Sequence, residues 1–292
     1  MTLRLGPYET LLKVDIVDFK DFVQLKHFGI RKLTYEEQCD LFDLESFDVD
    51  ENKDVKNCKP KSPEKKKNKL SKYLEGFSRQ DREELIGSEY YILCDRLENV
   101  ESILDAFRLH KLGYIVATFS KSQIYDACQY HYPRFIKIAK AGLLRINVSE
   151  LEEIEKLFLA IKSISNKKVK LNLERFINGP NLYYHSYINL VGILESLLIG
   201  NDNGELKFRL ALYVNHILKN TIKSDIEIDF ATAKKLYDIR SSLVHTGVSK
   251  KFSKELYLLL RDITREILVW NIYNPNYEVE NDFLETLFPS KK

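Results

Sequence analysis

SELEEIEKLFLAIKSI, residues Ser149 to Ile164, is where the chain changes from a mixed pattern to a regularly helical one. Its apolar residues recur every three or four positions, at 151, 154, 157, 158, 161 and 164. This spacing predicts an amphipathic α-helix that buries one face. Ser149 and Glu152 have the spacing of a capping box, which predicts that the helix starts here.

Four more helices are expected downstream, at about 184–199, 205–219, 230–246 and 252–273. Asp229 is a suitable N-cap for the fourth helix, and Gly247 is a suitable terminator. The last helix should stop before Pro275, because proline disfavours helical backbone in the residue ahead of it. Five helices with short connections predict a compact bundle.

The residues before Ser149 have a different pattern of apolar positions. Partly alternating or short apolar runs at 11–19, 89–94 and 113–119 predict strands, and the pattern at 100–110 predicts a helix. The expected fold class is therefore α+β. Residues 1–148 form an N-terminal mixed α/β or β-rich module, and residues 149–292 form an all-α bundle.

Charge is balanced over the whole chain but not along it. Lys and Arg number 45 against 43 Asp and Glu, a net charge of +2, which does not by itself indicate a nucleic-acid-binding protein. Residues 35–51 carry eight acids and no base, whereas residues 53–72 carry nine lysines. With so few apolar residues, the segment at about 50–72 is expected to be a flexible loop. Its lysines are either merely solvated or contact RNA phosphates, and Lys65, Lys66 and Lys67 are the candidates.

Several classes of protein have no support in the sequence. The four cysteines, at 39, 58, 94 and 128, lack zinc-ligand spacing, and His27, His110 and His131 have no ligand partner at a convincing distance along the chain. No metal or cofactor is expected, since P-loop, GxGxxG and GxSxG motifs are also absent. The longest apolar stretch, 187–200, is too short and too polar to span a bilayer. Without a secretion signal, the protein is expected to be cytoplasmic.

Two lone charges interrupt apolar stripes of the expected bundle. Arg240 has apolar or aromatic neighbours three and four positions away on both sides, and Glu195 is placed in the same way on the second helix. A buried charge is costly unless it is paired. We therefore expect Glu195 and Arg240 to form an ion pair between these helices. A purely structural pair is the alternative to a functional one.

His245 adds chemistry to this segment. It follows Arg240 by five positions, about 140° around an ideal helix. Side chains of this length can still converge on one cleft. Arginine suits the charge of a phosphodiester, and histidine suits proton transfer. Tyr184 and His185, at the start of the second helix, could line the same cleft, although packing or capping is the alternative for both.

The segment RSSLVH, 240–245, resembles the R-x4–6-H motif of the HEPN superfamily. The stretches LYDIRSSLVHTG (236–247) and LVGILESLLIG (190–200) are most similar to the Apea-type branch of that superfamily. In addition, ESILDAFRLHKLGYIVATF (101–119) is similar to the segment that often precedes the domain. The resemblance covers about 149–272 well and the N-terminal half only faintly.

The resemblance implies a four- to five-helix bundle that dimerises and cleaves RNA without a metal. Arg240 and His245 would be the catalytic pair, with the motifs of two subunits forming one cleft. Ser241 stands where the family often has Asn, Asp or His. Such proteins act in toxin–antitoxin and antiviral defence systems, so RNA, a second copy and a defence-system or antitoxin protein are the expected partners.

Our leading hypothesis is thus a metal-independent endoribonuclease that leaves 2′,3′-cyclic phosphate ends, with Glu195 orienting Arg240. The rival hypothesis is a catalytically inactive HEPN module that binds RNA, a nucleotide or a protein. The Ser241 departure and the small net charge favour the rival.

Overall fold

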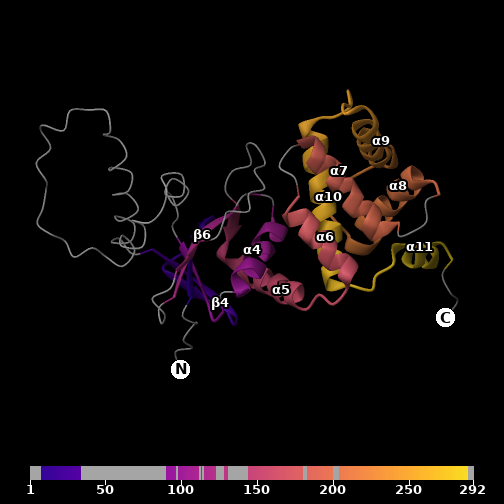
Figure 1. Cartoon of the computed structure of the whole chain (residues 1–292). Coiled ribbons are helices and arrows are strands. Elements are labelled where there is room, and N and C mark those ends of the chain that lie inside the picture. Colours follow the sequence, from indigo (N-terminus) through magenta and orange to yellow (C-terminus); the bar gives the residue numbers. More distant parts are fainter. Residues whose placement is uncertain are drawn as a thin grey trace, which may run out of the picture. The chain divides into compact units, whose positions relative to one another are not determined.

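The computed structural model describes residues 8–33, 90–96, 98–111, 113, 115–122, 128–130, 144–179, 183–199 and 204–288 (Figure 1). The chain divides into two compact units. Described residues up to Leu157 belong to the first unit, and those from Phe158 onward belong to the second. The expected division lay between residues 148 and 149, whereas this one falls within a helix.

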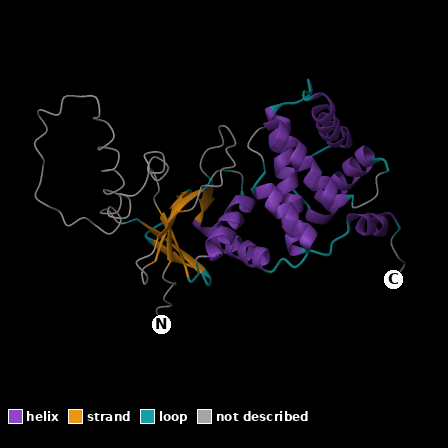
Figure 2. Ribbon diagram, in the orientation of Figure 1, coloured by secondary structure: helices purple, strands orange, loops and turns teal. Residues whose placement is uncertain are grey.

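A six-stranded sheet forms the centre of the first unit (Figure 2). Its strand order is β3-β4-β5-β1-β6-β7, and every neighbouring pair is antiparallel. The strands are β1 (Tyr8–Lys13), β3 (Phe22–Gln24), β4 (Phe28–Lys32), β5 (Tyr90–Cys94), β6 (Val116–Ser122) and β7 (Cys128–Tyr130). All five residues of β5 are buried, as expected of an inner strand that reads as a continuous apolar run.

The predicted strand at 11–19 is two strands instead of one. After β1 the chain enters β2 (Asp15–Val17), which pairs in parallel with β8 (Arg145–Asn147) in a second, two-stranded sheet. The predicted helix is confirmed as α4 (Glu98–His110), which buries Phe107 against Phe28 of β4, with 6.4 Å between ring centroids. The first unit is therefore a mixed α+β module.

Cys94 is a packing residue of this module. Its thiol is free and fully buried in β5. Burial, helped by the neighbouring Asp95 carboxylate, raises the pKa of the thiol to about 12. The side chain is therefore a protonated thiol at neutral pH and a poor nucleophile.

Helices make up the C-terminal part of the chain, as predicted. They are α5 (Leu151–Lys162), α6 (Lys167–Ile177), α7 (Tyr183–Leu198), α8 (Leu206–His216), α9 (Phe230–Thr246), α10 (Lys254–Tyr273) and α11 (Val279–Leu287). A π-helical turn, Ile217–Ile222, follows α8. The five predicted helices correspond to α5, α7, α8, α9 and α10. The sequence analysis missed α6 and α11.

Both predicted ends of α9 are confirmed. The side chain of Asp229 accepts a hydrogen bond from the backbone N–H of Thr232 at 2.5 Å. Gly247 adopts a left-handed φ of 73°, and its N–H donates to the carbonyl of Leu243 at 3.0 Å. Glycine is the residue that adopts this conformation without strain, so the helix ends where the sequence indicated.

The predicted capping box at Ser149 and Glu152 is wrong. Ser149 lies inside a 3-10 turn, Val148–Glu150, that precedes α5. The box belongs to that turn: Asn147 donates its backbone N–H to the carboxylate of Glu150 at 2.7 Å. Asn147 and Glu150 have the same three-residue spacing as Ser149 and Glu152, so the spacing alone could not choose between them.

Helix α7 packs against α6, α8, α9 and α10 (Figure 1). Its buried residues include Tyr187, whose hydroxyl donates to the backbone carbonyl of Leu236 on α9 at 3.1 Å. The surrounding helices bury their apolar faces against α7, and this decides which side of each helix faces α7. This central position lets α7 carry side chains that meet those of α6 and α9.

The C-terminal α11 is attached by polar contacts around Asp282. Its carboxylate accepts hydrogen bonds from the hydroxyls of Thr221 at 2.6 Å and Tyr277 at 2.8 Å, and lies 3.0 Å from Nε2 of His216. His216 is buried. These contacts join the π-helical turn to α11, an arrangement that no local pattern in the sequence predicts.

Candidate functional site

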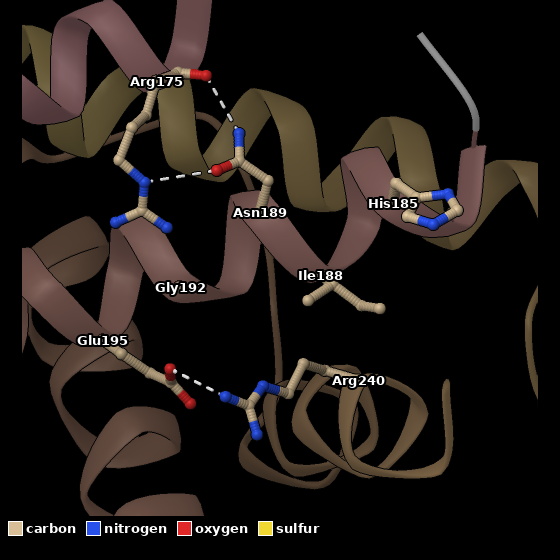
Figure 3. Close-up of a pocket in the computed structure, with 7 residues that line it drawn as sticks. All are labelled: Arg175, His185, Ile188, Asn189, Gly192, Glu195 and Arg240. Carbon is tan, nitrogen blue, oxygen red and sulfur yellow. Dashed lines mark hydrogen bonds and ion pairs between the residues drawn. The ribbon is translucent and has the colours of Figure 1, made fainter. Parts of the chain in front are cut away.

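The predicted pair between Glu195 and Arg240 is present. Nη2 of Arg240 on α9 lies 3.4 Å from Oε2 of Glu195 on α7 (Figure 3). The two side chains are 27% and 20% exposed, respectively, so the pair is partly buried. Arg240 lies at the edge of its apolar stripe and not within it, because Leu236 and Leu243 are buried whereas Val244 is 47% exposed.

The nearby arginines do not fully offset the free-energy cost of burying the Glu195 carboxylate. Burial raises the pKa of its carboxyl above the ordinary value, and the guanidinium groups of Arg240 and Arg175 lower it only in part. In the described part of the chain, Oε1 of Glu195 and Nε of Arg240 are buried without a hydrogen-bond partner. The pair therefore leaves one buried acceptor and one buried donor unsatisfied, which is a cost to the folded state.

Arg175 is the charged residue of this site that the sequence analysis missed. It lies in the last turn of α6, and its Nε donates to Oδ1 of Asn189 at 3.2 Å, while its Nη1 donates to Oδ1 of Asn172 at 3.3 Å. Asn189 in turn donates its Nδ2 to the backbone carbonyl of Arg175 at 2.9 Å. Both acceptors of the side chain are neutral amides, so these hydrogen bonds orient the guanidinium without neutralising it.

Gly192 makes room for this guanidinium on the surface of α7. A Cβ built on Gly192 would lie 2.8 Å from Nη2 of Arg175, closer than side chains approach one another. Glycine in a helix interior costs about 0.5–1 kcal/mol relative to alanine. In the structure, the absence of a side chain at Gly192 lets the guanidinium of Arg175 approach α7 closely, and Figure 3 shows Arg175 above Gly192.

These side chains line one pocket of about 530 Å³ on the helical unit. Its lining consists of Arg175, His185, Ile188, Asn189, Gly192, Glu195 and Arg240 (Figure 3). The pocket therefore brings together three of the predicted site residues: Arg240, Glu195 and His185. Two guanidinium groups against one carboxylate make it net positive, and the imidazole of His185 adds a group able to exchange a proton.

His245 is not among the residues that line this pocket. It lies exposed in the last turn of α9, next to Val244 and Val248, which are 47% and 63% exposed. The helix itself explains the separation, because five positions leave Arg240 and His245 on different faces of α9. Within one chain, the structure places Arg240 with His185 and leaves His245 on the surface.

The other predicted residues have separate positions. Ser241 is half-buried on α9 and does not line the pocket. The ring of Tyr184 packs edge-to-face on Phe252, with 4.9 Å between centroids, and is 44% exposed. Lys65, Lys66 and Lys67, like the whole Lys-rich segment at about 50–72, lie outside the described residues.

The described residues offer no grouped set of metal ligands. In the ranges that the structure describes, no three or more His, Cys, Asp or Glu side chains are grouped so that they could hold a metal ion. Among these residues, His110 instead lies 3.4 Å from Glu150, and His131 is outside the described ranges.

Comparisons with family models, curated proteins and solved structures found no match to this chain. None of the helices in the described ranges combines the length and apolar character needed to cross a membrane.

Proposed function

We propose that the protein is a HEPN-type, metal-independent endoribonuclease. The observation that carries this proposal is the partly buried Arg240–Glu195 pair, which lines a net positive pocket on a helical bundle. Arg240 also begins the R-x4-H motif that ends at His245 in the last turn of α9. A cationic pocket suits a phosphodiester, and the motif supplies an imidazole for proton transfer.

In this reaction the ribose 2′-oxygen attacks the adjacent phosphorus, and the bond from phosphorus to the 5′-oxygen breaks. The products carry a 2′,3′-cyclic phosphate and a 5′-hydroxyl. Arg240 would hold the phosphate and stabilise the charge that builds on it. His245 would take the proton from the 2′-hydroxyl or give one to the leaving 5′-oxygen. Glu195 would act as a positioning residue for Arg240.

The active form in this proposal is a homodimer. His245 is exposed, and it is flanked by the exposed apolar side chains of Val244 and Val248. Because His245 does not line the pocket of its own chain, a cleft that uses both residues needs the motif of a second copy. A two-fold interface at this end of α9 would cover the valines and bring two motifs together.

A catalytically inactive HEPN module is the second candidate, and two observations favour it. His245 does not line the pocket that Arg240 lines, so that pocket could bind RNA, a nucleotide or a protein without cleaving it. Ser241 at the position after Arg240 points the same way. Under either candidate, we place the protein in the cytoplasm, in antiviral defence or a toxin–antitoxin-like system, with the N-terminal module sensing a trigger or a partner.

The test is digestion of a defined RNA in excess EDTA, with mapping of the product ends. We expect cleavage by the wild type, cyclic phosphate ends, and no cleavage of an all-deoxy substrate, which lacks the nucleophile. His245→Ala should abolish cleavage. Lys250→Ala, which removes an exposed basic side chain beyond the same end of α9, should leave it unchanged.

Three results would count against the proposal. Loss of cleavage on chelation, with recovery on adding Mg²⁺, would overturn the metal-independent mechanism. Full activity of His245→Ala would remove the proposed proton-transfer residue. RNA binding by the wild type without any cleavage would favour the inactive module.

A further inference from the structure

We infer that Arg175 is a second phosphate-binding residue of the same site. In this inference, which rests on the proposed function, Arg240 holds the phosphate that is cleaved, and Arg175, in the same pocket, holds the phosphate of an adjacent RNA nucleotide. Arg175 comes from α6, outside the R-x4-H motif and outside the helices that carry Glu195 and Arg240. Its role would be to position the RNA chain.

Arg175 is held in place by neutral hydrogen-bond partners. Its side chain donates to two amide oxygens, those of Asn189 and Asn172, at 3.2 and 3.3 Å. In the part of the chain that the structure describes, no carboxylate lies within ion-pair distance of it. The guanidinium is thus oriented before any ligand arrives, and its charge is not neutralised by a direct partner.

The position of the Arg175 guanidinium also favours a ligand-binding role. Figure 3 shows Arg175 and Arg240 on opposite sides of the part of α7 that carries Gly192. Since Gly192 has no side chain, the guanidinium of Arg175 can lie over it, and from there it lines the same pocket as Arg240. Glu195 is hydrogen-bonded to Arg240 and not to Arg175, which leaves Arg175 as the cation available to a second anion.

The lining of the pocket indicates the class of ligand. Two guanidiniums and one carboxylate favour an anion, and planar guanidiniums match phosphate oxygens. At the other end, Ile188 and His185 offer an apolar side chain and an imidazole, which suit the sugar and base of a nucleotide. A volume of about 530 Å³ is enough for one nucleotide. Because only unpaired nucleotides can place a base in such a pocket, the ligand of this inference is a single-stranded RNA segment.

A purely structural role is the competing explanation. Arg175 could serve only to join α6 to α7 through Asn189. The two roles differ in one measurable quantity, the salt dependence of RNA binding. A side chain that contacts a phosphate displaces counterions, so its loss lowers the slope of log affinity against log salt by about 0.7 for a single strand. A side chain that only supports the fold does not change that slope.

The experiment measures binding of a fully 2′-O-methylated single-stranded RNA by fluorescence anisotropy at several salt concentrations. This probe cannot be cleaved through its 2′-oxygen, so binding is measured separately from cleavage. We expect Arg175→Gln to bind at least tenfold more weakly, with the slope lower by about 0.7. Arg175→Lys should keep the slope, because it keeps the charge. Lys170→Gln removes an exposed charge from the same helix and should change neither quantity.

Gly192→Ala is a second variant that leaves Arg175 in place. Its methyl group would displace the far end of a flexible side chain and not backbone, so the helix should tolerate it. We expect weaker RNA binding, as for Arg175→Gln, with a circular dichroism melt no lower than that of the wild type, because alanine is the better helix former. Adenosine 5′-monophosphate should compete only weakly with the oligonucleotide. Competition at equal affinity would show that the site takes free nucleotides, and would overturn RNA as the ligand.

The outcomes separate this inference from the proposed function. If the wild type cleaves RNA and Arg175→Gln binds with unchanged affinity and slope, the inference fails alone. A lower affinity with an unchanged slope would also overturn it, since Arg175 would then be structural. If the slope depends on Arg175 but unmodified RNA is not cleaved, the phosphate site stands and the endoribonuclease proposal fails.

Discussion

The partly buried ion pair between Glu195 and Arg240 should make a measurable contribution to the free energy of unfolding. Coupling between the two side chains is measured by comparing Glu195→Gln, Arg240→Gln and the double variant. Exposed pairs contribute about 0.2–1 kcal/mol, and breaking a fully buried pair costs about 3–5 kcal/mol. With 27% and 20% of the side chains exposed and 3.4 Å between Nη2 and Oε2, we expect a coupling of about 1–2 kcal/mol.

The two single variants should behave differently at neutral pH. Burial raises the pKa of Glu195, although Arg240 and Arg175 oppose it, so ionising this carboxyl costs free energy in the folded state. Glutamine avoids that cost, and Glu195→Gln should be at least as stable as the wild type. Arg240→Gln leaves the buried carboxylate without its partner and should be less stable by about 1–2 kcal/mol.

The pH dependence follows from the same raised pKa. Below about pH 4, Glu195 is protonated in both the folded and the unfolded chain, so the wild type and Glu195→Gln should be equally stable. As the pH rises through the ordinary value of 4.5 and then through the higher folded value, the wild type should lose stability relative to the variant. Above the folded pKa the difference should stay constant. The coupling to Arg240 needs the ionised carboxylate, so it should vanish at the acidic end.

The assay is urea unfolding followed by tryptophan fluorescence. Trp270 is the only tryptophan of the chain and lies on α10, so its signal reports the helical unit. Lys235→Gln, which removes an exposed charge from α9, is the matched control and should have no effect. A coupling energy within about 0.3 kcal/mol of zero at pH 7 would refute the reasoning, as would a wild type more stable than Glu195→Gln.

Three further predictions concern the rest of the helical unit. The wild type should be a dimer at micromolar concentration by light scattering, and Val244→Asp with Val248→Asp should make it a monomer; a monomeric wild type would contradict the proposed interface. Tyr187→Phe should cost about 1 kcal/mol in urea unfolding, because it removes a buried hydrogen bond to α9, and an unchanged midpoint would contradict this. Although burial raises the pKa of Asp282, its hydrogen bonds lower it overall, so Asp282→Asn should cost about 1 kcal/mol at pH 7. That difference should disappear as the pH falls through the lowered pKa, and its persistence in acid would count against the contacts that hold α11.

Local patterns in the sequence were enough to predict five of the seven α-helices described from α5 to α11. Helical periodicity and end signals are properties of neighbouring residues, which is why Asp229 and Gly247 mark the ends of α9 correctly. The pairing of Glu195 with Arg240 could also be predicted from the sequence, because a charge at or beside an apolar stripe needs a partner wherever the helices pack.

Only the tertiary structure decided which side chains share the pocket. The sequence analysis paired Arg240 with His245, its neighbour on the same helix. The packing of α6 and α9 against α7 instead places Arg240 near Arg175 and His185, a choice set by the crossing of helices and not by spacing along one of them. Helix α6 itself was missed, and Arg175 with it.

The strands of the N-terminal module show the same division. Short apolar runs identified β5 and β6, since alternation and β-branched or aromatic residues are local signals. The split of the predicted strand at 11–19 into β1 and β2 depends on a partner strand, β8, far away in the sequence. Burial and strand pairing between distant segments are decided by the fold as a whole, so a local pattern can predict that a strand exists but not which strand it joins.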